Sequence, residues 1–434
     1  MRILLSGLIG MSLMLCGCGG GAGGGATITT SGGGGNGGGA TAYNVVNAIV
    51  DQGPAALLAA NQTAVDLMYV NVTICAPGST TNCQTIDHVQ VDTGSQGLRI
   101  ISSALNSSLL NALPPVTLNG AAVAECTQFV DGYSWGEMVT ADVHLGGSDT
   151  STSGESAPGI PVQVIGTTVY PVPNACSQGA VNNMPENTVA QFGANGIIGI
   201  GLFDYDCGTA CDSVNNNPGW YYTCSAGSCT QAAVPVADQS VNPVFKLAAV
   251  NGITDNNGVI IELPAVGASG AATASGTLVF GIGTQANNAL APGATVMTTD
   301  DFYGFVSTSF NGSTFPQSYL DSGSNALYFD DSSIPICTQS SVQGFFCPAS
   351  ADSLSATITG LNGQAVLAPF TVGDALTLRS NNPSFAAYSN LAGSGNLSGA
   401  QTFDFGLPFF FGRNVYSAME NTDAGGTTGP YFAF

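Results

Sequence analysis

Residues 91–100 are Val-Asp-Thr-Gly-Ser-Gln-Gly-Leu-Arg-Ile, and residues 319–329 are Tyr-Leu-Asp-Ser-Gly-Ser-Asn-Ala-Leu-Tyr-Phe. In each stretch an apolar run is interrupted by Asp, a hydroxyl residue, Gly and Ser, and then resumes. A strand can carry a carboxylate to its end, and a glycine two residues later lets the backbone turn sharply. One such turn is common and indicates little. Two copies in separate halves of the chain predict that Asp92 and Asp321 form a pair that shares a proton and performs acid/base chemistry.

The composition predicts an exported, all-β protein. A chain of 434 residues is long enough for two lobes with separate cores, and only 7% of its residues are charged. Long stretches of Ala, Leu, Glu and Lys are missing, so we expect few and short helices. The net charge of -22 argues against nucleic acid or an anionic membrane surface as a partner. Scattered carboxylates that keep the surface soluble explain this charge most simply, and few basic groups also suit a protein that works in acid.

The N-terminus has the features of a bacterial export signal. Residues 1–17 combine a short basic end with an apolar run that is too short to span a bilayer. The residues before Cys18 resemble a lipobox, which predicts cleavage there and a lipid on the Cys18 sulfur; an ordinary secretory signal is the alternative. Because residues 19 and 20 are Gly rather than Asp, we expect an anchor in outer-membrane lipid, on the periplasmic or cell-surface side. Residues 18–41 are Gly-rich and predict a flexible tether.

Beyond Cys18 the mature chain has ten cysteines, an even number that predicts disulfides in an exported protein. Short loops favour pairing Cys75 with Cys83, Cys207 with Cys211, Cys224 with Cys229 and Cys337 with Cys347, which leaves Cys126 for Cys176. A metal site is the competing interpretation. The chain has only two His and no paired Cys-x-x-Cys motifs, so we expect neither a metal nor a cofactor.

The two halves of the chain share an order of features. Each has the Asp turn, then a Cys-bearing middle, then an apolar strand that ends in Gly, at residues 197–199 and 403–406. This weak internal repeat predicts two β-lobes related by a pseudo-twofold axis, with a cleft between them. The N-terminal lobe would span 42–240 and the C-terminal lobe 241–434. Residues 132–136, rich in Gly and aromatics and followed by an alternating strand, predict a β-hairpin turn with a mobile tip.

From about residue 60 onward the chain resembles the pepsin-like aspartic peptidases, in particular a divergent bacterial branch. The doubled Asp motif, with an apolar strand ending in Gly behind each copy, is the most specific element of this resemblance. It implies a bilobal fold with Asp92 and Asp321 as the catalytic dyad. It further implies supporting roles for the catalytic-loop residues Thr93, Gly94, Ser95, Ser322, Gly323 and Ser324. Thr93 and Ser322 would brace the two loops, and Ser95 and Ser324 would bind the outer carboxylate oxygens.

The chain departs from the family pattern directly after the first motif. Residues 96–100 replace the usual continuation, and the tryptophan that supports the flap tyrosine in the family is missing. The predicted hairpin would be the flap, with Tyr133 as the candidate for its tip. Trp135 either substitutes for the missing tryptophan or packs in the core, and Phe129 is an alternative tip residue.

These features predict a monomeric, lipid-anchored aspartic endopeptidase that hydrolyses a polypeptide substrate, prefers apolar side chains and works best in acid. The chain has no Gly-x-Ser-x-Gly elbow and no phosphate-binding loop, and two His are few for a catalytic triad. An alternative is a catalytically inactive surface protein of the same fold that binds peptide or glycan in its cleft. A third interpretation, a β-rich adhesin, requires that Asp92 and Asp321 lie far apart.

Overall fold

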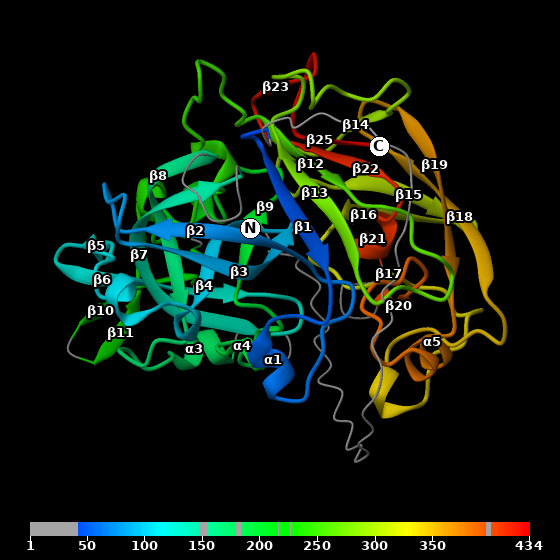
Figure 1. Cartoon of the computed structure of the whole chain (residues 1–434), viewed down its shortest axis with the longest axis horizontal. Helices are drawn as coiled ribbons and strands as arrows, with labels where there is room; N and C mark the ends of the chain where they lie inside the picture. The colour runs from blue at the N-terminus through cyan, green and yellow to red at the C-terminus, as the bar shows by residue number, and fades with distance from the viewer. Residues whose placement is uncertain (1–41, 147–153, 179–183, 216, 226, 396–400) are drawn as a thin grey trace, which may run out of the picture.

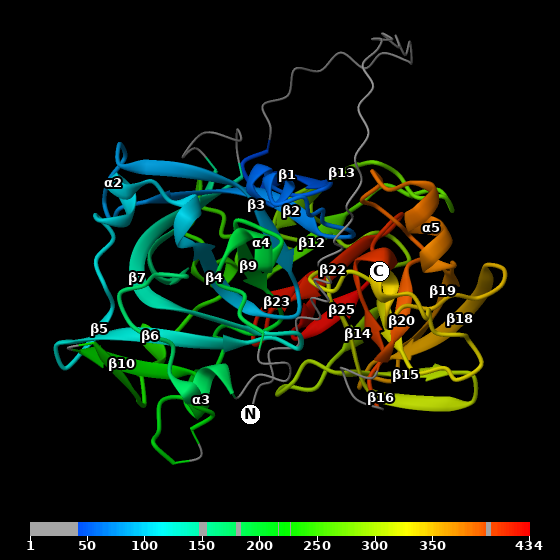
Figure 2. The ribbon, with the colours of Figure 1, turned by 90° about the horizontal axis from the view of Figure 1, so that it is seen from below.

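The computed structural model describes residues 42–146, 154–178, 184–215, 217–225, 227–395 and 401–434. The chain is mostly β, and two barrel-like sheets form two lobes, which confirms the predicted fold class. Figures 1 and 2 show the lobes side by side, one coloured blue to green and the other yellow to red. The predicted signal peptide, the tether and Cys18 lie outside the described residues. The division between residues 240 and 241 stays a prediction.

The sheet of the first lobe closes on itself. Its strands run in the order β7, β8, β4, β9, β3 and β2, and β2 pairs with β7 again. The strands of this ring are β2 (Met68–Cys75), β3 (Cys83–Asp92), β4 (Gln96–Ile101), β7 (Tyr133–Leu145), β8 (Glu155–Ile165) and β9 (Gly196–Ile200). Attached to it are β5 (Thr117–Leu118), β6 (Ala121–Gln128), β10 (Tyr221–Ser225) and β11 (Ser228–Gln231).

A central group of strands continues this sheet toward the second lobe (Figure 1). Strand β1 (Val45–Val50) pairs with β2 on one side and with β13 on the other, so it joins the two parts. The other central strands are β12 (Gly258–Glu262), β13 (Ala274–Phe280), β14 (Val296–Thr298), β22 (Asn414–Ala418) and β25 (Tyr431–Ala433). Strands from near both ends of the described chain therefore meet in the middle of the molecule.

The second lobe is built around a seven-stranded sheet with an aromatic core. Its strands are β15 (Val306–Phe310), β16 (Ser313–Leu320), β17 (Leu327–Phe329), β18 (Asp352–Thr359), β19 (Ala365–Val372), β20 (Ala392–Ser394) and β21 (Asp404–Phe405). The rings of Phe329 and Phe403 stack with their centres 4.7 Å apart, and Phe405 stacks on Phe403 at 4.4 Å. Such stacked pairs add to the stabilisation from burial. Strands β23 (Asp423–Ala424) and β24 (Thr427–Thr428) form a separate small ribbon.

Helices are short, as expected. The α-helices are α1 (Ala55–Ala59), α2 (Ser107–Leu110), α3 (Asn174–Ser177), α4 (Val189–Phe192) and α5 (Ala375–Asn381). Single 3-10 turns occur at η1 (Ser102–Ala104), η2 (Gly208–Ala210), η3 (Val236–Asp238), η4 (Val244–Lys246), η5 (Ser340–Val342) and η7 (Leu407–Phe409). None of the helices in the described part of the chain has the length and apolarity needed to span a membrane.

The two lobes repeat one strand arrangement around the Asp motifs. In the first lobe, β9 lies between β3 and β4, parallel to β3 and antiparallel to β4, and β8 is parallel to β4. In the second lobe, β21 lies between β16 and β17, parallel to β16 and antiparallel to β17, and β20 is parallel to β17. The internal repeat predicted from sequence is therefore present in the topology.

Five disulfides link the ten cysteines as predicted. Four close short loops, Cys75–Cys83, Cys207–Cys211, Cys224–Cys229 and Cys337–Cys347, and Cys126–Cys176 spans 50 residues. Because disulfides persist in oxidising compartments, they support an extracytoplasmic protein.

Candidate active site

Asp92 and Asp321 occupy equivalent positions in the repeated arrangement. Asp92 ends β3, and Asp321 follows β16 directly. Oδ1 of each carboxyl accepts a hydrogen bond from the backbone N–H two residues later, from Gly94 at 2.7 Å and from Gly323 at 2.7 Å. Oδ2 of each accepts from the serine three residues later: Ser95 donates to Asp92, and Ser324 donates to Asp321 at 2.9 Å. Both serines thus lie where the resemblance implies.

Thr93 and Ser322 link the two loops. The Thr93 N–H donates to the Ser322 hydroxyl at 3.1 Å, and the Ser322 N–H donates to the Thr93 hydroxyl at 2.9 Å. Each hydroxyl also donates to a carbonyl of the opposite loop, Thr93 to Leu320 at 3.0 Å and Ser322 to Val91 at 2.9 Å. Buried polar groups at this junction are satisfied by one another, so neither loop can shift without breaking several hydrogen bonds.

The two carboxyls meet at the centre of the molecule. They share a hydrogen bond, and both residues have 0% of their surface exposed. A Cβ added at Gly323 would lie 2.5 Å from Asp92 Oδ1 and 3.0 Å from Asp321 Oδ1, so the site requires glycine there. Burial, the Asp92 charge and the Asp404 charge raise the pKa of Asp321 well above its ordinary value. The interpretation that needed the two Asp far apart is wrong.

A third carboxyl, Asp404, adjoins the pair and was missed from sequence. It lies on β21, is fully buried, and its Oδ2 lies 2.6 Å from the Ser324 hydroxyl oxygen. Burial is the main cause that raises the pKa of Asp404 well above its ordinary value, with the Asp92 charge adding to it. A single charge inside the apolar run of residues 402–411 was the sequence signal that could have marked it. Within the described ranges, no three His, Cys, Asp or Glu side chains are arranged to hold a metal ion.

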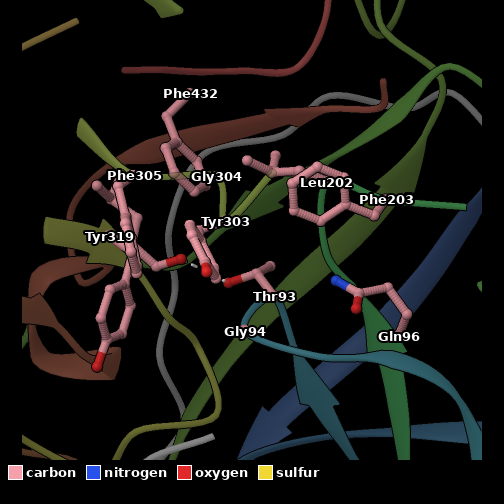
Figure 3. Close-up of a pocket in the computed structure, with 11 residues that line it drawn as sticks. Thr93, Gly94, Gln96, Leu202, Phe203, Tyr303, Gly304, Phe305, Tyr319 and Phe432 are labelled. Carbon is pink, nitrogen blue, oxygen red and sulfur yellow. Dashed lines mark hydrogen bonds between the residues drawn. The ribbon is translucent and has the colours of Figure 1, made fainter. Parts of the chain in front are cut away.

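A small cavity of about 30 Å³ adjoins the loops, and Figure 3 shows the side chains around it. This volume accommodates one or two water molecules. The cavity is lined by Thr93, Gly94, Gln96, Leu202, Phe203, Tyr303, Gly304, Phe305, Tyr319, Leu320 and Phe432. Thr93 and Gly94 directly follow Asp92, so the apolar and aromatic wall begins one residue from the pair.

The aromatic wall depends on a loop fixed by Asp300. One carboxylate oxygen of Asp300 accepts from the N–H groups of Phe302 at 2.9 Å and Tyr303 at 2.6 Å, and the other accepts from Phe305 at 2.7 Å. The rings of Tyr303 and Phe305 stack with centres 5.3 Å apart. Phe302 and Tyr303 are largely exposed, at 49% and 41%. The loop therefore presents a rigid aromatic surface next to the candidate site.

The predicted hairpin exists, but its turn is not at 132–136. Strands β6 and β7 pair up to Gln128 and Tyr133, so the turn spans residues 129–132 and residues 133–136 are strand. Gly136, which had indicated a turn, instead allows the close approach of the neighbouring strand. A Cβ at this position would lie 1.9 Å from the Val164 carbonyl oxygen. The prediction from glycine content was wrong because a glycine required by a close neighbouring strand has the same local signature as a turn glycine.

The three flap candidates pack inside the first lobe. Phe129, Tyr133 and Trp135 are 2%, 7% and 2% exposed, and none of them lines the cavity described above. Phe129 packs edge-on against Phe192 with ring centres 5.8 Å apart. The Trp135 Nε1–H donates to the Tyr170 carbonyl at 3.3 Å. Trp135 therefore has the packing role that the sequence left open.

The hairpin is held next to its turn by backbone hydrogen bonds. Tyr133 exchanges backbone hydrogen bonds with residues 184–186, its N–H donating to Met184 at 2.9 Å and its carbonyl accepting from Glu186 at 2.8 Å. The charge of Asp131 contributes to raising the pKa of Tyr328, after burial and the charge of Asp404. Since Tyr328 belongs to β17 of the second lobe, the tip lies near the loop that carries Asp321.

The departure from the family pattern at residues 96–100 has a local cause. Arg99 is fully buried and donates to Glu125 at 2.6 Å, to Thr127 at 2.8 Å and to the Gln96 carbonyl at 2.7 Å. Gly97 has a φ of +105°, and a Cβ there would lie 2.9 Å from Ser240 Cβ and 3.2 Å from the guanidinium. Strand β4 therefore carries Gly97 because its φ is positive and because Ser240 and the buried arginine leave no space for a side chain.

Fold and site together define a two-lobed, mostly β protein with a braced pair of buried Asp at its centre. A family model described as "Protein of unknown function (DUF3443)" matches residues 40–434, and the chain belongs to that family. No curated protein matches the chain. The matched region includes both Asp loops, the hairpin and Asp404, so the whole candidate site lies within the family domain.

Proposed function

We propose that this protein is an aspartic endopeptidase with a pepsin-like architecture. One observation carries the proposal: two Asp-(Thr/Ser)-Gly-Ser loops emerge from equivalent strand arrangements and bring Asp92 and Asp321 into hydrogen-bond contact. The reciprocal bonds between Thr93 and Ser322 support it, because they fix the loops in a symmetric pair. A fold alone does not define an activity, so the proposal rests on the site.

The reaction follows from one proton shared by two carboxyls, since two adjacent buried carboxylates cannot both ionise. Asp321 holds this proton, in keeping with its raised pKa, and donates a hydrogen bond to the scissile carbonyl. Asp92 accepts a proton from a water molecule as the water oxygen bonds to the carbonyl carbon. That proton then passes to the amide nitrogen as the C–N bond breaks, and no covalent enzyme intermediate forms.

The substrate is an extended polypeptide bound between the lobes, with apolar side chains near the scissile bond. The wall of Leu202, Phe203 and Phe305 supports this preference, because it offers apolar surface beside Gly94. Both Asp are fully buried, so binding requires movement of a covering element. We propose the hairpin of β6 and β7 as that flap, since its tip approaches Tyr328.

The proposed site of action is outside the cytoplasm, with the protein anchored as a monomer to the outer membrane through lipid on Cys18. Incorporation of labelled fatty acid tests this anchor, and a Cys18→Ala variant should lose the label. Recovery of labelled Cys18→Ala protein would contradict the anchor and leave the peptidase proposal untouched.

The decisive experiment measures cleavage of an unfolded polypeptide at about pH 3 to 5. Asp92→Asn and Asp321→Asn should each lower kcat/KM by about 10³-fold or more while leaving the fold intact. Asp66→Asn is the matched control, because Asp66 is also fully buried but accepts from the Tyr388 N–H at 2.7 Å, outside the two Asp loops. Equal cleavage by the wild type and by both site variants would overturn the proposal.

A second candidate function, an inactive protein of this fold that binds peptide or glycan in its cleft, is favoured by the complete burial of the two Asp. A statine-type inhibitor that mimics the tetrahedral intermediate separates the two. An active enzyme should be stabilised by this inhibitor in acid and lose the effect in Asp92→Asn. A binding protein should instead be stabilised by uncleaved peptide or glycan, equally in the wild type and in the variant.

A further inference from the structure

The Ser324 hydroxyl contacts two carboxyls at once. Its Oγ lies 2.9 Å from Asp321 Oδ2 and 2.6 Å from Asp404 Oδ2, and all three residues are fully buried. A hydroxyl carries one proton, so it can donate along only one of these contacts and must accept along the other. Both contacts are hydrogen bonds only if one of the two carboxyls is itself protonated. The geometry therefore requires a proton shared among Asp321, Ser324 and Asp404.

Of the two carboxyls that contact Ser324, Asp404 is well suited to be protonated in acid. Its second oxygen, Oδ1, has no hydrogen-bond partner within the described part of the chain. A buried carboxylate with an unpaired oxygen is costly, whereas a neutral carboxyl needs less solvation. The strand register fixes this arrangement. Asp404 on β21 lies opposite Tyr319 on the neighbouring strand β16, and Tyr319 precedes Asp321 by two residues.

Other titratable groups around Asp404 add negative charge or are neutral. Asp92 acts on it from the loop after β3, and Asp321 from the loop after β16. The Tyr328 phenol faces it from β17, donates to Asn325 at 2.6 Å, and is also influenced by Asp131 and Asp66. Two of the few cationic side chains lie elsewhere: Arg99 binds Glu125, and His88 binds Asp51 and Asp87.

We propose that Asp404 is a positioning residue that, through the Ser324 hydroxyl, keeps Asp321 protonated to higher pH. This inference rests on the proposed function. As pH rises, the first proton leaves from Asp404, and Ser324 turns to donate to the new carboxylate. Ser324 then no longer donates to Asp321, so an Asp321 carboxylate would lack that hydrogen bond, and Asp321 keeps its proton for the scissile carbonyl. One O–H bond is lost to solvent, the others only change partners, and no co-reactant is needed.

The test is the pH profile of kcat/KM for the wild type, Asp404→Asn, Ser324→Ala and the double variant. An amide keeps the size of the carboxyl but cannot ionise, so Asp404→Asn should move the alkaline limb about one pH unit toward acid. Cleavage on the acid plateau should stay within about threefold of the wild type. In the Ser324→Ala background the Asn substitution should add no shift. Asp66→Asn should leave the limb in place.

Several outcomes separate this inference from the proposed function. An alkaline limb that stays unmoved in Asp404→Asn, in an enzyme whose plateau is intact, overturns the inference alone. An equal shift in Asp66→Asn overturns it as well, because the alkaline limb would then respond to the loss of any buried acid and not to Asp404 in particular. If the wild type does not cleave the polypeptide, the proposed function is defeated. Infrared spectroscopy then tests, without any need for activity, whether Asp404 holds a proton. A carboxylic-acid carbonyl band in the difference spectrum of the wild type minus Asp404→Asn in acid supports the shared proton, and the absence of that difference band refutes it.

Discussion

At the scale of single residues, the centre of this protein is made of small polar groups with little freedom to change. Gly323 leaves no space for a Cβ beside the two carboxyls. Thr93 and Ser322 each donate and accept across the loops, and so satisfy backbone groups that would otherwise be buried without partners. The family resemblance implied these roles, because the motif that carries it includes the hydroxyls. Asp404 was not predicted, because its partner Ser324 lies 80 residues away in the chain.

The bracing hydroxyl of Thr93 should be measurable as stability. Thr93→Ala leaves the Ser322 N–H without its acceptor and the Leu320 carbonyl without its donor. We expect a loss of about 1–3 kcal/mol in the free energy of unfolding, from denaturant titration. Thr93→Ser keeps the hydroxyl and should lose less than about 1 kcal/mol. Equal losses in the two variants would show that the methyl group, rather than the hydroxyl, stabilises the junction.

The buried Arg99 gives a second prediction at this scale. Arg99→Met leaves Glu125 and Asp206 buried without their cation, at sites where the guanidinium lies 2.6 Å and 3.6 Å from the carboxylates. Removal of one partner from a buried ion pair costs about 3–5 kcal/mol. Arg413→Met is the matched control, because Arg413 donates to the carbonyls of Phe409 and Pro369 and leaves no carboxylate behind. Denaturant titration of both variants should show the larger loss for Arg99→Met, and a comparable loss in both would contradict it.

At the scale of elements, short cysteine loops allowed four disulfides to be predicted, and Cys126–Cys176 followed as the remaining pair. Sequence failed at the hairpin, where it placed the turn at 132–136 rather than 129–132. Gly136 is a glycine because β8 passes too close for a side chain, and that contact joins segments about 30 residues apart. A local pattern cannot distinguish such a glycine from a turn glycine.

The disulfide that joins β6 to α3 should stabilise the protein more than the short ones. In the chain-entropy view, opening the 50-residue loop of Cys126–Cys176 costs about 4 kcal/mol, against about 2 kcal/mol for the Cys207–Cys211 loop. Paired Cys→Ser variants of each bridge, compared by thermal and denaturant unfolding, test this. A larger loss from the Cys207–Cys211 pair would show that local packing, rather than loop closure, decides their contributions.

At the scale of the whole molecule, the fold buries many acids with few cations. Burial raises the pKa of Asp66, Asp206, Asp321, Asp404, Glu186 and Glu155. For Glu155 the pKa is raised from 4.5 to about 8 by burial and by the neighbouring Asp255. Each such group binds its proton more tightly in the folded state than in the unfolded state. Folding is therefore favoured in acid, a property that the net charge alone does not determine.

This arrangement predicts that stability falls as pH rises. Between pH 4.5 and about 8, the folded state holds the Glu155 proton while the unfolded state has lost it, so the free energy of unfolding decreases through this window. The thermal midpoint should be higher at about pH 5 than at about pH 8. Glu155→Gln should flatten this dependence and be more stable than the wild type at the upper end. Asp51 and Asp331 have lowered pKa values, so their contribution to the free energy of unfolding is lost in acid. This loss begins only as pH falls below about 3.8, outside the window of Glu155.

If the thermal midpoint falls more steeply with rising pH in Glu155→Gln than in the wild type, the proton on Glu155 is not the cause of the pH dependence. An unchanged slope would assign the pH dependence to the remaining buried acids. Both outcomes are measured in the same set of melting curves, and neither depends on peptidase activity.

The sequence by itself determined the β-rich class, the repeat of two Asp motifs and the disulfides that close short loops. These features follow from alternation, from turn residues, and from the short separation of cysteines along the chain, whereas the hydroxyls that brace the loops were implied by the family resemblance. Only the tertiary structure decided that the Asp carboxyls share a hydrogen bond, that Asp404 joins them through Ser324, and that Gly97 makes space for Arg99. Each of these depends on a contact between segments whose approach is set by strand order and register, which no local pattern encodes.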